Sequence, residues 1–354
     1  MTSRLEAETA EQSRVATDLL ARQLPQLDEW RAALRSDEID GVVVVARGSS
    51  DNAARYAQYL WSLRTGHPVT LATPSLHTVY GRPLDVSGQA VVAISQSGAS
   101  PDVVEVLRAA ARQGSPTVAV TNDPRSPLAE VAGAVLDLAA GEERSVAATK
   151  TYTASLLAVA VLALALDDRD GQDASAYEVE LQAVPDAMAA AIEATTGLAE
   201  ASRVVAAAHR GIVVGRGLNL CTAYETALKI TELTGSLMAP YSPADLLHGP
   251  IGAVGPEVPV VLVAPAEPAS ASVLEVAAEA QRRGAPVVLI GPEGTSVDGP
   301  VAATVALPTA SAVADWLTPV VAVVPGQLLA RTVAEVRGID VDQPGGLSKV
   351  TRTT

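Results

Sequence analysis

The chain has 354 residues, enough for two domains of ordinary size, and 48% of them are hydrophobic, which excludes wholesale disorder. An excess of acidic residues gives a net charge of −15, which argues against nucleic acid as a partner. The single cysteine, Cys221, excludes an intrachain disulfide and a cysteine-based zinc cluster. The apolar run Ala154–Leu166 is too short to cross a bilayer, and no signal peptide is evident, so we expect a cytoplasmic protein with no membrane partner.

The first elements in chain order form a helical lead-in and then a strand. Residues 1–36 are polar and helix-prone with spaced leucines, which predicts helices that pack on the body of the protein. The apolar run that begins at Gly41 indicates a buried strand. A Gly/Ser loop that contains Ser50 follows, and then a helix to about Leu63.

A hydroxyl-rich loop follows the next strand. The run Ala90–Ile94 predicts that strand, and the apolar spacing over Val103–Gln113 predicts a helix. Such a loop places free backbone N–H groups at the positive end of a helix dipole, and Gly98 lets a ligand approach the backbone. The side-chain donors are Ser95, Gln96, Ser97 and Ser100. One serine would indicate only a helix N-cap, but three hydroxyls and a glycine in six residues favour a phosphate site.

The chain then repeats itself. The strand, Arg-Gly loop and helix that begin at Gly41 recur from Gly211, and after one gap the Arg47-Gly48 pair recurs as Arg216-Gly217, at an offset of 169 residues. In each copy, alternating strands and helices indicate an α/β fold: a mostly parallel sheet with helices on both faces and ligands at the strands' carboxyl ends. The predicted segments are a lead-in (1–36), a first domain (37–168), a linker helix (169–198), a second domain (199–335) and a tail (336–354).

The two copies differ in the loop that would hold phosphate. Where the first copy has Ser95–Ser100, the second has Ala264–Ala269, with no hydroxyl until Ser270. The second loop also carries Glu267, whose carboxylate would repel a phosphate group. Only the first copy is therefore expected to bind phosphate.

The second copy carries charged residues on one helix. Glu225, Lys229 and Glu232 are spaced at i, i+4 and i+7, which places them on one face. On an isolated helix this pattern is typical of a solvated stripe with ion pairs. The loop that follows favours a functional interpretation, because it holds His248, one of four histidines, in a Gly-Pro turn that no core requires.

Taken together, these motifs resemble the isomerase half of glucosamine-6-phosphate synthase, which is built from two sugar-isomerase (SIS) domains. The matching stretches are the Glu-rich helix after Gly215-Arg216-Gly217, Leu246–Pro250, the tail Gly338–Thr351, Ser95–Gly98, Ser145–Lys150 and the lead-in Glu8–Ser13, where Ser13 replaces a family proline. The resemblance covers nearly the full chain. It implies two tandem SIS domains and a sugar phosphate as the small-molecule substrate.

The resemblance also implies roles for single residues. The phosphate would bind Ser95, Gln96, Ser97 and Ser100, with Ser50 close by, and Val146 and Ala148 would contact the substrate. His248 would open the sugar ring, Glu232 would move a proton between C2 and C1, and Lys349 would form a Schiff base, with Glu225 and Lys229 in support.

Further implications concern cofactors and assembly. We expect no metal and no cofactor, because proton transfer between C2 and C1 needs only a carboxylate and positioned donors. In the family, the histidine comes from the partner subunit, which predicts a homodimer. Ala148 and Ser348 replace a family serine and alanine at substrate-contacting positions.

Three functions remain open at this point. The synthase has a glutaminase domain ahead of its isomerase half, whereas this chain opens directly on the isomerase half, so we expect no built-in ammonia source. The leading prediction is a deaminase/isomerase that converts glucosamine 6-phosphate to fructose 6-phosphate and ammonia. The alternatives are a deglycase acting on fructosamine or fructosyl-amino-acid 6-phosphates and a non-catalytic sugar-phosphate sensor. A sensor could discard Glu232, His248 and Lys349, so the presence of all three favours an enzyme.

Overall fold

The computed structural model describes residues 2–35, 37–167, 174–309 and 312–345. The chain divides into two compact units, each with its own parallel sheet. Among the described residues, the N-terminal unit consists of Arg14–Glu143 and Lys150–Gln182, and the C-terminal unit of 2–13, Arg144–Thr149 and 183–345. The predicted α/β class, with two parallel sheets flanked by helices, is confirmed.

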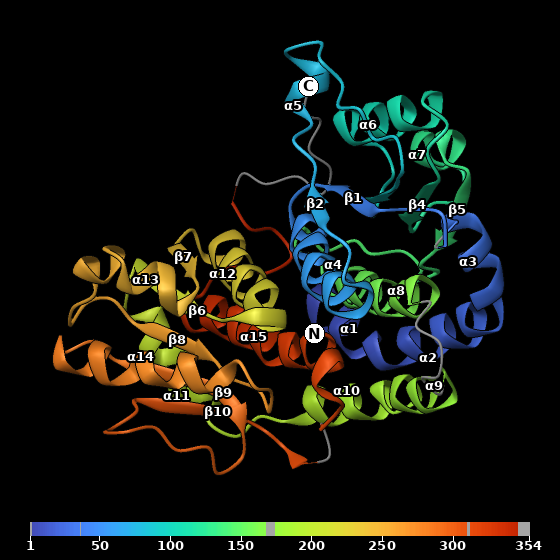
Figure 1. The fold of residues 1–354 in the computed structure, drawn as a ribbon. Coiled ribbons are helices and arrows are strands. Elements are labelled where there is room, and N and C mark those ends of the chain that lie inside the picture. The colour runs from blue at the N-terminus through green and yellow to red at the C-terminus, as the bar shows by residue number, and fades with distance from the viewer. Residues whose placement is uncertain (1, 36, 168–173, 310–311, 346–354) are drawn as a thin grey trace. The chain divides into compact units, whose positions relative to one another are not determined.

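The N-terminal unit contains a five-stranded parallel sheet in the order β2-β1-β3-β4-β5 (Figure 1). Its strands are β1 (Gly41–Ala46), β2 (Val69–Leu71), β3 (Gln89–Ile94), β4 (Thr117–Thr121) and β5 (Ala134–Asp137). Its helices are α2 (Gln12–Gln23), which starts in the other unit, η1 (Leu24–Gln26), α3 (Leu27–Leu34), α4 (Ser49–Thr65), α5 (Ser75–Thr78), α6 (Pro101–Arg112), α7 (Pro127–Val131), α8 (Lys150–Leu166) and α9 (Ala174–Gln182). Every residue of β1 is buried, as expected for a central strand covered on both faces.

The C-terminal unit repeats this topology in the order β7-β6-β8-β9-β10. Its strands are β6 (Arg210–Val214), β7 (Leu237–Tyr241), β8 (Val260–Val263), β9 (Val287–Pro292) and β10 (Ala303–Leu307). Its helices are α1 (Arg4–Ala10), α10 (Val184–Glu193), α11 (Leu198–Ala206), η2 (Gly217–Asn219), α12 (Leu220–Thr234), α13 (Pro243–Leu247), η3 (Pro250–Ala253), α14 (Ser270–Arg282), η5 (Asp315–Leu317) and α15 (Thr318–Val336). Each strand holds the place of the strand five positions earlier, so the internal repeat is confirmed.

Helices α6 and α12 begin earlier than their apolar spacing predicts. Helix α6 starts at Pro101, where proline fits the first helical position and its missing N–H costs nothing. Helix α12 starts at Leu220 because the preceding 3-10 turn leads directly into it. The apolar run Ala154–Leu166 forms most of α8, which is buried along its whole length.

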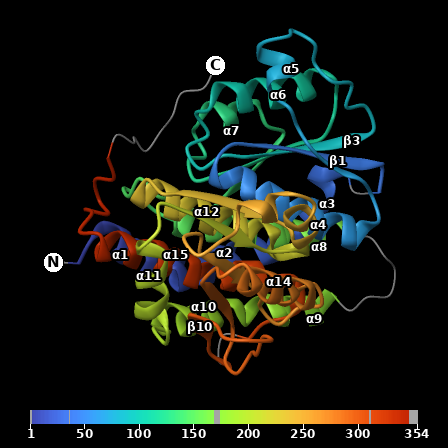
Figure 2. The same cartoon turned by 90° about the vertical axis from the view of Figure 1, so that its left-hand side faces the viewer.

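Helix α15 forms the centre of the C-terminal unit. With η5 it covers Asp315–Val336, and its length and apolar composition would suit a membrane span, but 89% of that apolar window is buried inside the protein. It packs against α10, α11 and α12, and Figure 2 shows it lying along α12. A Cβ added at Gly326 would lie 2.2 Å from Thr226 Oγ1 of α12, so glycine permits this close packing. Its burial indicates a core helix.

Candidate functional site

The hydroxyl-rich loop lies at the topological switch point of the N-terminal sheet. In a sheet of order 2-1-3-4-5, the chain leaves in opposite directions after β1 and β3, which opens a crevice where ligands bind. Ala46 lies opposite Ile94, so the loops that follow these two residues are neighbours. Ser95 comes directly after β3, and Ser50 lies in the first turn of α4. The N-termini of α4 and α6 both face this edge, where their N–H groups favour an anion.

The serines of this loop are arranged around its backbone. Ser97 Oγ accepts a hydrogen bond from Ala99 N at 3.3 Å. Ser100 is the N-cap residue of α6 with extended backbone, but its hydroxyl makes no capping hydrogen bond. Gln96 O accepts from Asn122 N at 3.0 Å, which ties the loop to the end of β4. The Ser100 hydroxyl is therefore not committed to its own helix and can serve a ligand.

Gly98 is required by the geometry of the loop. Its φ of +58° lies in the left-handed region, and a Cβ at this position would come within 2.0 Å of Ser126 Oγ. Gly98 N donates to Ser95 O at 3.1 Å, and Leu128 N donates to Gly98 O at 3.0 Å. The backbone of the loop is thus fixed from both sides.

An ion pair that the sequence analysis did not identify joins the two loops of this switch point. Arg47 follows β1, and its Nε lies 2.7 Å from Oδ2 of Asp102 in the first turn of α6. The Asp102 side chain is 2% exposed, and its other oxygen accepts from Val103 N. The Arg-Gly pattern, which both copies share, was the sequence feature that could have indicated a role for Arg47. The pair holds the start of α6 against the end of β1.

The charged face of α12 is buried in the C-terminal unit. Lys229 Nζ lies 2.5 Å from Glu232 Oε2 and 3.4 Å from Glu225 Oε1. The Lys229 and Glu225 side chains are 2% and 0% exposed, whereas that of Glu232 is 26% exposed. A solvated stripe is therefore excluded. Buried charges of this kind are costly unless paired, so the cluster has a specific arrangement in which only the Glu232 carboxylate opens to solvent among these three.

Val146 and Ala148 lie in an irregular segment that belongs to the C-terminal unit. Glu8, buried in α1, accepts hydrogen bonds from the backbone N–H groups of Arg144, at 2.5 Å, and Ser145, at 3.2 Å. Along the segment, Val146 and Ala148 are half-buried while the residues between and beside them are buried. Both predicted contact residues therefore share the more open side. Glu8 is a positioning residue that only the lead-in motif could have suggested.

His248 lies at the C-terminal end of α13 and is exposed. Its Nδ1 lies 2.7 Å from Ala244 O, so Nδ1 carries a proton and Nε2 is left toward solvent. Within the described residues it makes no hydrogen bond to the carboxylates of α12. Lys349 and Ser348 lie outside the described residues. Across the described ranges, no three His, Cys, Asp or Glu side chains gather closely enough to hold a metal ion.

The predicted residues thus form two groups. Ser50 and the Ser95–Ser100 loop come together in the N-terminal unit. The cluster on α12, the segment with Val146 and Ala148, and His248 belong to the C-terminal unit. Within each group the chain supplies one half of the predicted chemistry: an anion site in the first, and a carboxylate anchored by a buried lysine in the second.

The equivalent switch point of the C-terminal sheet holds a carboxylate of the protein itself. Asn219, after β6, donates through Nδ2 to Oε1 of Glu267, after β8, at 3.0 Å. Burial raises the pKa of the Glu267 carboxyl, the Asn219 hydrogen bond opposes this rise, and the nearby charge of Asp315 adds to it. The Glu267 side chain thus occupies the position that corresponds to the serine loop, and the absence of phosphate binding there stays a prediction.

Comparison with known proteins places the chain in a family. The SIS domain family matches residues 38–165 and 205–334. The glutamine–fructose-6-phosphate aminotransferase [isomerizing] of Mycobacterium tuberculosis is 35% identical over 333 residues, covering 91% of this chain and 53% of that protein. The chain therefore spans about half the length of the curated relatives it matches.

Solved structures show the same relationship. The C-terminal domain of glucosamine-fructose-6-phosphate aminotransferase from Francisella tularensis superposes with a TM-score of 0.88 and 27% identity, covering 97% of this chain and 99% of that one. Glucosamine-6-phosphate deaminase from Thermotoga maritima shares the fold, with a TM-score of 0.69, 19% identity and coverage of 96% and 100%. The chain belongs to the SIS domain family, as two SIS segments related to the C-terminal domain of these aminotransferases.

Proposed function

We propose that the chain is an aminosugar-phosphate deaminase/isomerase that converts glucosamine 6-phosphate to fructose 6-phosphate and ammonia. One observation carries the proposal: the partly exposed Glu232 carboxylate is anchored through one oxygen on the buried ammonium of Lys229. The relatives, by their names, handle fructose 6-phosphate and its aminated form, which makes an aminosugar phosphate the natural substrate class.

The geometry of α12 suits a proton shuttle. Lys229 holds Oε2 of Glu232, which leaves Oε1 for the substrate. In the open-chain substrate, Oε1 would take the proton from C2 and return it to C1 while a second proton passes from the amine nitrogen to O1, which converts the aldehyde and amine into a C2 imine and a C1 alcohol. Water then adds to the imine carbon, and ammonia leaves with the proton it needs. Glu225, on the other side of Lys229, balances the buried charge.

The other proposed residues bind the substrate and open its ring. The phosphate would accept hydrogen bonds from the Ser95–Ser100 loop and Ser50, and its charge would be favoured by the N-termini of α4 and α6. His248, with Nε2 toward solvent, would take and return the proton during ring opening. Lys349 stays a prediction as the Schiff-base residue, and so does the cytoplasmic location.

The first test follows both products of one reaction. The purified full chain is incubated with glucosamine 6-phosphate while ammonia and fructose 6-phosphate are measured together. We expect equal amounts of the two products, and we expect Glu232→Gln to lower the rate roughly 10²–10⁴-fold, the usual contribution of a general base. Glu275→Gln is the matched control, because Glu275 is an exposed glutamate of α14 in the same unit.

The remaining outcomes separate the alternatives. Sugar phosphate that binds without ammonia release would refute the deaminase, and fructosamine 6-phosphates would then be tested as deglycase substrates. Binding of sugar phosphates without turnover of either class would indicate a sensor. Calorimetric titration with fructose 6-phosphate measures binding independently of catalysis.

We also propose that the enzyme is a homodimer in which His248 completes the partner's site. The exposed position of His248 supports this arrangement. Inactive Glu232→Gln and His248→Ala variants are mixed and allowed to exchange subunits. After random exchange, about half of the dimers are heterodimers, and each heterodimer has one intact site out of two. Activity should therefore return to about a quarter of the wild-type value. No recovery after verified exchange would place His248 and Glu232 of the same subunit in one site.

A further inference from the structure

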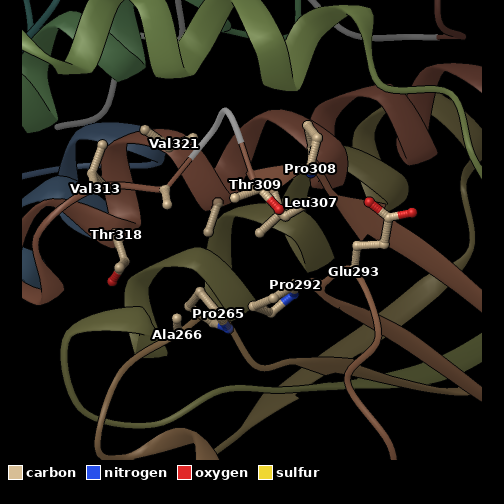
Figure 3. Close-up of a pocket in the computed structure, with 12 residues that line it drawn as sticks. Pro265, Ala266, Pro292, Glu293, Leu307, Pro308, Thr309, Val313, Thr318 and Val321 are labelled. Carbon is tan, nitrogen blue, oxygen red and sulfur yellow. The ribbon is translucent and has the colours of Figure 1, made fainter.

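The C-terminal unit contains a pocket that the proposed reaction does not use (Figure 3). Its cavity volume is about 170 Å³, which is smaller than a drug-sized site and suits a compact ligand. One wall is formed where β8, β9 and β10 end, by Pro265, Pro292 and Leu307. The opposite wall is the first turns of α15, including Thr318 and Val321. The pocket thus lies at the carboxyl edge of a parallel sheet, the edge where this class of fold binds ligands.

The chemistry of this pocket differs from that of the serine loop. Its walls are mainly apolar, and Glu293, at the end of β9, supplies a carboxylate with an exposed side chain. None of its twelve described lining residues is basic. Glu267 and Asp315 add further negative charge close to Thr318, because Asn219 bonds both Glu267 and Thr318, and Asp315 lies three residues before Thr318. An anion would be repelled here, whereas a cation would find a partner.

We propose that this pocket is a second ligand site, for a small molecule with an apolar body and one ammonium group. The body replaces water against Pro265, Leu307 and Val321, and the ammonium group pairs with the Glu293 carboxylate at the rim. The proposal is independent of the reaction assigned to the chain, because no residue of this pocket belongs to the serine loop or to the charged face of α12.

The wall of the pocket is hydrogen-bonded to the start of α12. Thr318 Oγ1 accepts from Asn219 Nδ2 at 2.8 Å, and Asn219 is the N-cap residue of α12. The same amide nitrogen donates to Glu267. A ligand that orders Thr318 would therefore also order the first turn of the helix that carries Glu232. This gives the site a readout that does not depend on enzyme activity.

Three probes of the same shape test the charge preference. Aminoadamantane, adamantanol and adamantanecarboxylate share one rigid apolar body and differ in their single polar group. We expect the amine to bind the full chain about tenfold more tightly than the alcohol, and the carboxylate not to bind, as measured by calorimetry. Bound amine should also slow amide hydrogen exchange in the first turn of α12.

Two variants and two controls locate the binding. Glu293→Gln should bring the affinity for the amine down to that for the alcohol, and Ala266→Trp, on the exposed wall, should block both by filling the space. Glu275→Gln and Ala271→Trp are the matched controls on the exposed face of α14. Equal affinity for all three probes, or binding unchanged in both pocket variants, would overturn the proposal. If Ala266→Trp fails to fold, Glu293→Gln alone decides.

Discussion

The two sheets have the same strand order but opposite occupants at their switch points. In the N-terminal unit, the loop after β3 presents serine hydroxyls next to the N-termini of two helices. Gly98 stands in this loop where Ser126 comes close to the backbone. In the C-terminal unit, the loop after β8 presents Glu267, which Asn219 binds from the neighbouring loop. One switch point presents hydrogen-bond donors, and the other is occupied by a carboxyl group of the protein itself. The topology therefore selects the location of a site, and a loop of six residues selects its chemistry.

The two units also differ in the ion pairs that their Arg-Gly loops make. Arg47 in the first unit pairs with the buried Asp102. Its counterpart in the second unit, Arg216, is exposed, and the position that matches Asp102 is Ala271. The second unit thus lacks the clamp that holds the first loop in shape. Its charged residues instead lie on α12, where Lys229 is buried between two glutamates.

Among the substitutions that test this comparison, Gly98→Ala should change the free energy of unfolding most. The added Cβ would meet Ser126 Oγ at 2.0 Å, and the positive φ strains any side chain, so unfolding should become easier by about 2–5 kcal/mol. The Gly66→Ala control has a φ of +74° in the left-handed helical region and nothing within 4 Å of its Cβ, and should cost about 1–2 kcal/mol. Chemical denaturation of both variants measures the difference. Equal losses would show that the loop shifts freely.

Removing the arginine of each Arg-Gly loop tests the clamp. Arg47→Ala leaves the buried Asp102 carboxylate without its cation and should cost about 2 kcal/mol of unfolding free energy, less than a fully buried pair because Arg47 is half-exposed. Arg216→Ala removes an exposed side chain and should change stability by about 0.5 kcal/mol or less. Thermal unfolding at low and high salt compares them. A loss of similar size at Arg216 would contradict the asymmetry between the units.

A hydroxyl deletion in each loop tests which copy holds phosphate. Ser97→Ala should weaken binding of fructose 6-phosphate by roughly tenfold, the value of about one hydrogen bond to a charged group. Ser270→Ala deletes a hydroxyl that donates to Pro265 O in the second loop and should leave binding unchanged. Titration calorimetry gives both affinities. Weaker binding in Ser270→Ala alone would reverse the assignment.

Glu267→Gln should change the free energy of unfolding least, and the size of this change depends on pH. The folded state raises the pKa of this carboxyl, so it binds more protons than the unfolded state does, and stability falls as pH rises through the raised pKa. Glutamine keeps an oxygen for Asn219 and does not titrate. The variant should match the wild type at pH values below the ordinary carboxyl pKa and exceed it at neutral pH, on the order of 0.5 kcal/mol. Thermal unfolding across pH measures this, and a variant that is less stable at neutral pH would show that the carboxylate itself is needed.

Local patterns predicted much of the fold, whereas phosphate binding by the serine loop stays a prediction. Apolar runs located β1 and β3, and a strand followed by serines and a helix located the anion loop, because these signals depend on neighbours in the sequence. The internal repeat also predicted that Glu267 excludes phosphate from the second copy. Each of these conclusions needed only residues that are close together along the chain.

Contacts between distant residues could not be predicted in this way. Glu8 lies 136 residues before Arg144, whose N–H it accepts, and no periodicity links the two. The sequence also could not predict that the α12 cluster is buried, because the spacing of Glu225, Lys229 and Glu232 is the same on a solvated helix and on a buried one. Only the packing of α15 against α12 decides between them.

The interleaving of the two units has a consequence for the order in which the protein folds during synthesis. All described residues of the N-terminal unit have been made once Gln182 has left the ribosome, whereas α12 lacks its packing partner α15 until that helix emerges. Helix α1, made among the first residues, waits longest, because Asp342 caps it through the N–H groups of Arg4 and Leu5. A nascent chain therefore carries a complete N-terminal sheet while the C-terminal unit still lacks its central helix.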